Sequence, residues 1–145
     1  MRVRCIKTII SNPWPELSEA GWQNADNYLT IGKEYDVYAI HSSWLSNNIG
    51  CYLICDDVYN DQDYYWPLYI PTFYFEVIDN TKPPFWTVSS KDPDYEGPPE
   101  IGPDKRGKYS YYEAIVDGDP AAVATFRRIR AMTLSARSKT SFFII

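Results

Sequence analysis

The sequence is poor in metal-binding and disulfide-forming residues, with one histidine and three cysteines among 145 residues. An odd number of cysteines does not suit a disulfide framework and indicates reduced thiols, as in a cytoplasmic protein. His41, Cys51 and Cys55 would supply three of the four ligands of a zinc site, but C-x3-C is not one of the common zinc spacings. We therefore expect a cytoplasmic protein without a metal or a cofactor.

The chain also lacks the motifs of the common enzyme classes. It has no glycine-rich phosphate loop, no G-x-S-x-G elbow and no cysteine placed beside the single histidine by a known motif. The stretch "DDVYNDQDYY", residues 56–65, is rich in aspartate but has neither the glycine nor the final glutamate of a calcium loop. Aspartates in a turn stay hydrated and do not gain the raised pKa that acid catalysis needs. The sequence therefore favours a non-enzymatic role.

Apolar runs are short throughout the chain, and none approaches the length that spans a membrane. The N-terminal "MRVRCIKTII" starts basic and becomes apolar, but no small-residue cleavage site follows it. This segment predicts a first strand rather than a signal peptide. Aromatic residues form 17% of the sequence and supply enough burial for one compact, β-rich unit.

Charge is divided unevenly along the chain. Residues 1–119 contain all 19 acidic residues and 9 basic ones, a net charge of −10, whereas residues 120–145 contain 5 basic residues and no acidic one. An acidic body disfavours binding to a phosphate backbone and favours a basic protein partner, because opposite charges steer association. The alternative is a hydrated acidic surface with a basic helix that pairs with it.

Alternating apolar residues predict several short strands. "YLTIGKEYDVYAI" predicts a turn at Gly32 followed by a half-buried strand, and "CYLIC", residues 51–55, is typical of a central strand. "TFYFEVID" is expected to place Phe73, Phe75 and Val77 on one face, and "FWTVSS" predicts a further short strand. "SSWLSNNIG" and residues 91–108, rich in proline and glycine, are expected to be connections.

Helical signals occur only in the last third of the chain. Gly118 is expected to end a first helix, and Asp119 with Pro120 is expected to begin a second one as its N-cap and first residue. "FFII", residues 142–145, is expected to form a last strand or a packed tail. Apolar residues recur at helical spacing in the second helix and predict one buried stripe, formed by Val123, Phe126, Ile129 and Met132.

The segments "LTIGKEYDV", "CYLICDD" and "IPTFYFEVID" follow one another in an order that resembles the SH3-like small barrel. In that family, L-x-x-G-x-x-Y-x-V carries the second strand, and Pro-x-x-Phe/Tyr-x-x-Val carries a short turn and the closing strand. The resemblance implies a binding scaffold, although the Ala-Leu-Tyr-Asp-Tyr motif of eukaryotic, proline-binding SH3 domains is missing. We therefore expect an α+β, mainly β chain. An SH3-like antiparallel barrel at residues 1–90 would be followed, at residues 91–145, by a long loop and one or two C-terminal helices packed on the barrel as a single compact unit.

The stretch from residue 56 to residue 69 is the candidate partner-binding site. Tyrosine and tryptophan combine apolar area with a polar tip, as in interface hot spots, and aspartates around them would form a rim that speeds encounter with a basic partner. The alternative is that about half of these rings face the core. The candidate residues are Asp56, Asp57, Asp61, Asp63, Tyr64, Tyr65, Trp66 and Tyr69.

The tail "YYEAIVDGDPAAVATF" resembles accessory helices of small immunity proteins, which cover the active site of a bacterial toxin with an acidic, aromatic surface. The resemblance implies a protein that neutralises a basic toxin. The alternative is a domain that binds a small or anionic ligand, or an enzyme, with Arg127, Arg128 or Arg130 at the pocket.

Overall fold

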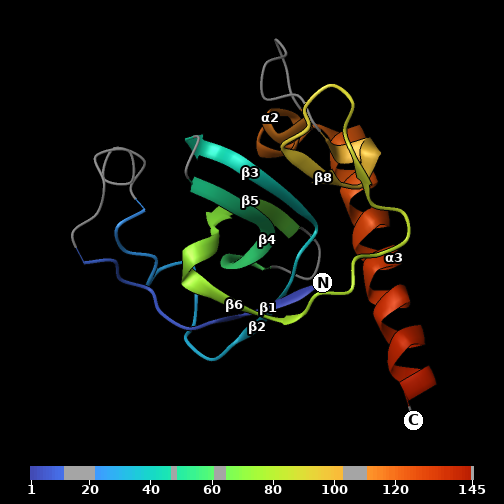
Figure 1. The fold of residues 1–145 in the computed structure, drawn as a ribbon. Coiled ribbons are helices and arrows are strands. Elements are labelled where there is room, and N and C mark those ends of the chain that lie inside the picture. Colours follow the sequence, from blue (N-terminus) through green and yellow to red (C-terminus); the bar gives the residue numbers. More distant parts are fainter. Residues whose placement is uncertain (12–21, 47–48, 61–64, 103–110, 145) are drawn as a thin grey trace. The chain divides into compact units, whose positions relative to one another are not determined.

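The computed structural model describes residues 1–11, 22–46, 49–60, 65–102 and 111–144 (Figure 1). They belong to two compact units, unit 1 (residues 1–81) and unit 2 (residues 82–145). The described chain is α+β and mainly β, with antiparallel strands and one main C-terminal helix, so the prediction of the fold class is confirmed at this level. The boundary expected at residue 90 lies within unit 2.

Unit 1 contains two groups of antiparallel strands, ordered β2-β1-β6 and β5-β4-β3. Within the described residues, the hydrogen-bonded pairing does not close these strands into a barrel. Two residues, Val37 and Tyr38, separate β2 from β3, so one nearly continuous segment passes from the first group to the second. The strands are β1 (Arg2–Cys5), β2 (Glu34–Asp36), β3 (Ala39–Ser46), β4 (Ile49–Asn60), β5 (Tyr65–Pro71) and β6 (Phe75–Asp79).

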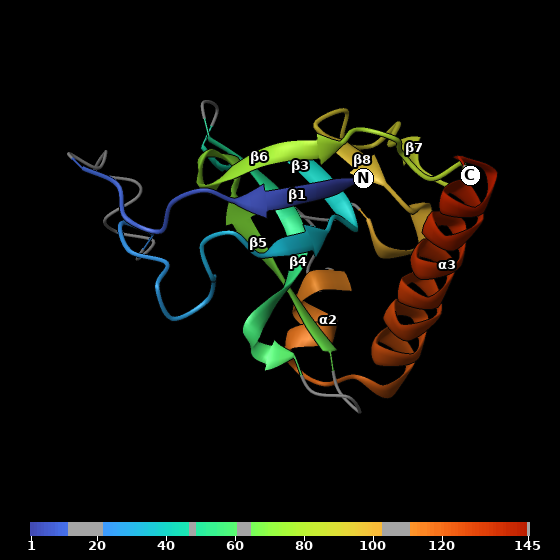
Figure 2. The same ribbon diagram turned by 90° about the horizontal axis from the view of Figure 1, so that it is seen from below.

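Strand β1 is the centre of the first group and lies beside β6 in Figure 2. Its Val3 and Cys5 side chains are buried, and they alternate with the arginines Arg2 and Arg4, as expected for a strand with one face toward the core. Val3 lies opposite Tyr35 on β2 and opposite Val77 on β6. The strand predicted from "RVRCIKTII" is therefore confirmed over its first half.

The arginines of β1 form ion pairs across the sheet to acidic residues on both neighbours. Arg2 lies 2.7 Å from Glu34, and Arg4 lies 3.1 Å from Glu76 on β6. Arg2 also lies 3.9 Å from Asp36. Such exposed cross-strand pairs add about 0.2–1 kcal/mol each. They help to fix the register, and they use the positive charges of β1 within unit 1.

The run "CYLIC" lies in β4, the middle strand of the second group, as the sequence predicts. Cys51, Leu53 and Ile54 are buried there. After β5 the chain forms a short 3-10 turn, η1 (Thr72–Tyr74), which leads directly into β6. Tyr74 on this turn is fully buried and is one of the largest side chains in the core.

Unit 2 combines a short hairpin with helices. The first part of unit 2 is rich in proline and forms the strands β7 and β8. In this hairpin Thr87 lies opposite Gly97, and Val88 lies opposite Glu96. No helix in the described part of the chain is both long enough and apolar enough to cross a membrane. The elements are β7 (Thr87–Val88), β8 (Tyr95–Gly97), the 3-10 turn η2 (Pro99–Ile101), α2 (Tyr111–Val116) and α3 (Pro120–Ile144).

The junction between α2 and α3 has the capping chemistry that the sequence predicts. Gly118 has φ 74°. The N–H of Gly118 donates to the carbonyl of Ile115 at 3.1 Å, and the N–H of Asp119 donates to the carbonyl of Ala114 at 2.9 Å. These two bonds form a Schellman motif at the end of α2. The Asp119 carboxylate then accepts a hydrogen bond from the N–H of Ala122 at 3.0 Å, so Asp119 is the N-cap of α3.

The apolar stripe of α3 is also confirmed. Phe126 and Ile129 are fully buried, and Val123 and Met132 are half-buried. The helix continues through Ile144, so the expectation of a last strand at "FFII" is wrong over residues 142–144. A continuous run of helix-forming residues without glycine or proline extends α3 that far.

Three other local expectations are wrong. Residues 42–46 of "SSWLSNNIG" belong to β3, because cross-strand pairing with β4 outweighs the low strand propensity of serine. Residues 95–101 of the expected long loop form β8 and η2. Phe73 lies on η1 and not on the strand, and Val77 is exposed although Phe75 is buried, so these three residues do not share one buried face.

The cap of α3 yields a stability prediction. Replacing Asp119 by alanine is expected to lower the free energy of unfolding by about 1 kcal/mol, because the N–H of Ala122 loses its acceptor. Urea unfolding followed by circular dichroism would measure this. Asp117→Ala changes an exposed aspartate two residues earlier and is the matched control. Equal effects of the two substitutions would contradict the capping role.

Candidate functional site

A long excursion connects β1 to β2 and extends from residue 6 to residue 33. Its two described arms are joined by backbone hydrogen bonds, from Ala25 N–H to Thr8 C=O at 2.7 Å and from Ile10 N–H to Gln23 C=O at 3.1 Å. Where the second arm returns to the sheet, the N–H of Gly32 bonds to the carbonyl of Cys5 at 2.8 Å. Gly32 has φ 88°, a left-handed conformation that favours glycine, and the turn predicted there is confirmed.

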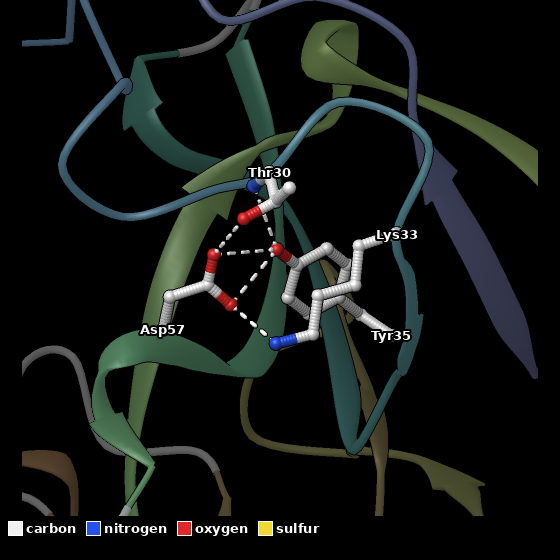
Figure 3. Close-up of polar contacts among 4 residues, drawn as sticks. All are labelled: Thr30, Lys33, Tyr35 and Asp57. Atoms are coloured by element: carbon white, nitrogen blue, oxygen red, sulfur yellow. Dashed lines mark hydrogen bonds and ion pairs between the residues drawn. The ribbon is translucent and has the colours of Figure 1, made fainter.

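The returning arm is bound to β4 by one carboxylate, that of Asp57. Four residues form this group, which we call the Asp57 cluster: Thr30, Lys33, Tyr35 and Asp57 (Figure 3). The Thr30 hydroxyl and the Lys33 ammonium each donate to the carboxylate at 2.6 Å, and the Tyr35 hydroxyl lies 3.1 and 3.2 Å from its two oxygens. The hydroxyl of Tyr35 in turn accepts the backbone N–H of Thr30 at 2.9 Å. The polar side-chain groups of these four residues thus bond to one another.

The electrostatics of the cluster keep Asp57 ionised. Burial by itself raises the pKa of the Asp57 carboxyl, but the donors Lys33, Thr30 and Tyr35 outweigh this effect and hold that pKa below its usual value. Burial, and then the negative charge of Asp57, raises the pKa of Tyr35 well above its usual value. The cluster is therefore an ionised carboxylate held by protonated donors. This arrangement favours a structural role and does not provide a general base.

Further hydrogen bonds fix the same excursion to the core. The N–H of Asp57 donates to the carbonyl of Tyr28 at 2.9 Å, so β4 also contacts the arm through its backbone. At the other end, the buried hydroxyl of Tyr74 donates to the carbonyl of Trp22. Burial raises the pKa of Tyr74 to about 12, with a contribution from the charge of Asp26. The described part of the excursion is therefore an ordered platform.

An aromatic cluster occupies β3 and β5. Trp44 is stacked on Tyr69 with ring centroids 4.0 Å apart, and the buried His41 contacts both rings edge-on, at 5.5 and 6.4 Å. His41 also accepts the N–H of Ser43 at its Nδ1 atom, at 3.2 Å. These contacts explain the single histidine as a packed core residue. Within the described residues, no group of three or more His, Cys, Asp and Glu side chains is placed to hold a metal ion.

The structure separates the residues of the predicted partner-binding site. Asp56 is 0% exposed and Tyr69 is 5% exposed, so the expectation that these two side chains lie on an exposed surface is wrong. Successive residues of a strand face opposite sides, which places Asp57 in its polar cluster and Asp56 in the interior. Asp61, Asp63 and Tyr64 lie outside the described residues, and the side chains of Tyr65 and Trp66 lie outside them too.

Three exposed isoleucines were not identified from the sequence as candidates. Ile6, Ile9 and Ile31 are 47%, 58% and 63% exposed, and all three belong to the excursion. Ile6 and Ile31 adjoin the bonded pair of Cys5 and Gly32, so they lie close together at the base of the excursion. Two signals for these residues were available in the sequence: Ile31 precedes a glycine turn, and Ile9 lies in the short run "TII". Exposed apolar groups on an ordered platform are typical of an interaction surface.

The helix arginines of the alternative prediction do not line the groove found in unit 2. Arg127 and Arg128 are exposed on α3, and the guanidinium of Arg128 lies 3.9 Å from the sulfur of Met132. The groove is instead lined by residues of the β7 to η2 segment.

Comparison with known proteins identifies no relative. No family model matches the chain, and neither a curated protein nor a solved structure resembles it significantly. The chemistry of its own residues therefore carries any functional interpretation.

The Asp57 cluster gives a second prediction. Replacing Asp57 by asparagine is expected to lower the free energy of unfolding at neutral pH by about 2 kcal/mol, because hydrogen bonds to a charged group contribute about 1.5–3 kcal/mol. Urea unfolding measures this. Glu76→Gln removes an exposed ion pair from the same unit and is the control, with an expected loss below about 1 kcal/mol.

The same variant tests the protonation state of Asp57. Because its pKa is lowered in the folded protein, the stabilisation is fully present above the ordinary aspartate pKa of about 4 and is lost as the pH falls through the folded-state pKa. The difference between the parent protein and Asp57→Asn should therefore shrink below pH ~4. A difference that stays constant down to pH ~2 would contradict an ionised, paired Asp57.

Proposed function

We propose that the chain is a non-enzymatic protein-binding module that binds a basic protein, as an immunity protein does when it occludes the active site of a toxin. The observation that carries this proposal is the charge of unit 1. Its 81 residues contain 11 acidic and 4 basic residues, a net charge of −7. A field of this sign accelerates encounter with a basic partner and disfavours nucleic acid.

The basic residues of unit 1 do little to offset this field locally. Arg2 and Arg4 are engaged by acidic residues on β2 and β6, and Lys33 is engaged by Asp57. The arginine pairs join β1 to its neighbouring strands, and the lysine pair joins the excursion to β4, so these three side chains do not form a separate basic patch. The acidic residues that exceed them in number remain for a partner.

Apolar area for such an interface is available on the excursion. Ile6, Ile9 and Ile31 project from a backbone that the Asp57 cluster and the Tyr74 hydrogen bond hold in place. Interfaces commonly combine an apolar centre with a charged rim, and a preordered platform reduces the entropic cost of binding. Asp61 and Asp63 with Tyr64, Tyr65 and Trp66 are proposed as the acidic and aromatic part of the surface.

The fold proposed for unit 1 is an SH3-like small barrel. Three observations support it: the strand orders β2-β1-β6 and β5-β4-β3, the passage of one segment from the first group to the second at Val37 and Tyr38, and the 3-10 turn before the last strand. A barrel of this kind serves as a scaffold for binding and does not itself imply a reaction.

A charge-reversal experiment tests the proposal. The tagged intact chain should retain one stoichiometric basic protein from its source lysate, and retention should decrease at raised salt because exposed charges are screened. The double variant Asp61→Lys/Asp63→Lys should reduce affinity for the purified partner at least about tenfold, a change of about 1.4 kcal/mol. Asp57 is left unchanged, since its replacement would disturb the fold.

The control has the same net charge as the double variant. Glu100→Lys/Asp117→Lys reverses two exposed acidic residues of unit 2 and should leave affinity almost unchanged. Equal losses in the two double variants would show that only total charge matters. The inhibitor role further requires that the purified chain abolishes the partner's toxicity at a one-to-one ratio. A partner whose toxicity or activity is unaffected would refute it.

A further inference from the structure

A groove of about 350 Å³ lies entirely within unit 2. Its volume is at the lower end of the range for small-molecule sites, which is about 300–1,000 Å³. Residues from the end of the hairpin and from the turn that follows it form its walls. The lining residues are Thr87, Val88, Ser89, Ser90, Lys91, Tyr95, Pro99 and Gly102.

The floor of the groove is held in shape by Tyr95. This side chain is buried, and its hydroxyl donates to the carbonyl of Pro98 at 2.6 Å. Gly102 packs directly on the Tyr95 ring, because a Cβ atom at this position would lie 2.1 Å from the ring. Only glycine allows this approach without displacing the ring. The groove is therefore formed by a fixed aromatic floor and does not depend on a mobile side chain.

The hairpin register places polar side chains along one wall. The N–H of Ser89 bonds to the carbonyl of Tyr95 at 3.2 Å, and Thr87 lies opposite Gly97. Side chains alternate along a strand, so Thr87 and Ser89 share a face with Tyr95. Lys91 lies on the bend that follows the strand and also lines the groove, so the lining includes two hydroxyls and an ammonium.

The hydrogen-bonding capacity of Ser89 restricts what can bind beside it. Its Oγ atom already accepts the N–H groups of Lys91 and Asp92, at 3.0 and 3.2 Å. A hydroxyl has two acceptor positions and one proton, so toward the groove Ser89 can act only as a donor. A ligand at this point must therefore present an acceptor.

Lys91 adds a positive charge to the same wall. It is the only ionisable cationic group in the lining, and among the described residues its ammonium makes no ion pair or hydrogen bond. Two other described lysines, Lys33 and Lys82, are paired with acidic residues. An ammonium beside a hydroxyl that can only donate favours a compact anion that accepts several hydrogen bonds.

We propose that this groove binds a small carboxylate, with the carboxylate group on Lys91, Ser89 and Thr87 and a short apolar part against Pro99. All of the lining residues of the groove belong to unit 2, so the proposal uses none of the residues proposed for the protein surface of unit 1. A free organic acid and the C-terminus of a peptide both present this chemistry.

Titration of the intact, 15N-labelled chain with sodium butyrate tests the proposal. Amide resonances of residues 87–91 should shift in a saturable way. Butyramide, the neutral probe of the same shape, should bind with at most about a tenth of the affinity of butyrate. A capped dipeptide with a free C-terminus and its C-terminal amide form the second arm. Tighter binding of the free-acid dipeptide than of butyrate would identify a peptide terminus as the source, and the reverse would identify a free organic acid.

Two variants separate the specific site from general charge effects. Lys91→Gln should weaken butyrate binding about tenfold or more, because the exposed ammonium contributes a charge-assisted hydrogen bond. Lys7→Gln removes one exposed lysine from unit 1 and should leave butyrate affinity unchanged. The proposal is overturned if butyrate causes no saturable shift, if butyramide binds equally well, or if both variants behave alike.

Discussion

The Asp57 carboxylate is the interaction on which unit 1 depends most. It joins β4 to the returning arm of a connection that starts after Cys5 and ends at Lys33, immediately before β2. A long connection costs conformational entropy when it is ordered, and a single charged acceptor with three donors offsets part of that cost. Because Lys33 and Tyr35 flank the start of β2, the same contacts also fix where β2 pairs with β1.

Local chemistry determined what could be predicted from the sequence. The junction of the two helices follows from Gly118 and Asp119 alone, since a positive φ and a capping carboxylate act within a few residues. The central strand was likewise predicted from one apolar run. Long-range pairing was not predictable in this way. Serines at 42–46 form a strand because β4 lies beside them, and β8 forms within a proline-rich segment because β7 pairs with it.

The candidate site shows the same limit at the level of single side chains. Asp56 and Asp57 look equivalent in the sequence, yet one is buried and the other is held by three donors. Their difference comes from strand alternation and from partners 22 to 27 residues away, which no local pattern reveals. Tyr69 shows the same limit. Its residue type is common at interfaces, but the ring of Trp44 on another strand is stacked on it. The exposed isoleucines were overlooked because apolar residues are assumed to be internal.

The two units offer opposite binding chemistries, and two lysines show how this arises. Lys33 lies against Asp57 at 2.6 Å, so its charge contributes to the order of unit 1 and is unavailable to a ligand. Lys91 makes no such contact among the described residues and lies on a wall whose neighbouring serine can only donate. Unit 1 has a net charge of −7 and unit 2 a net charge of +2. The proposed binding of a basic protein by unit 1 and of a small anion by unit 2 both follow from this difference in how the charges are paired among the described residues.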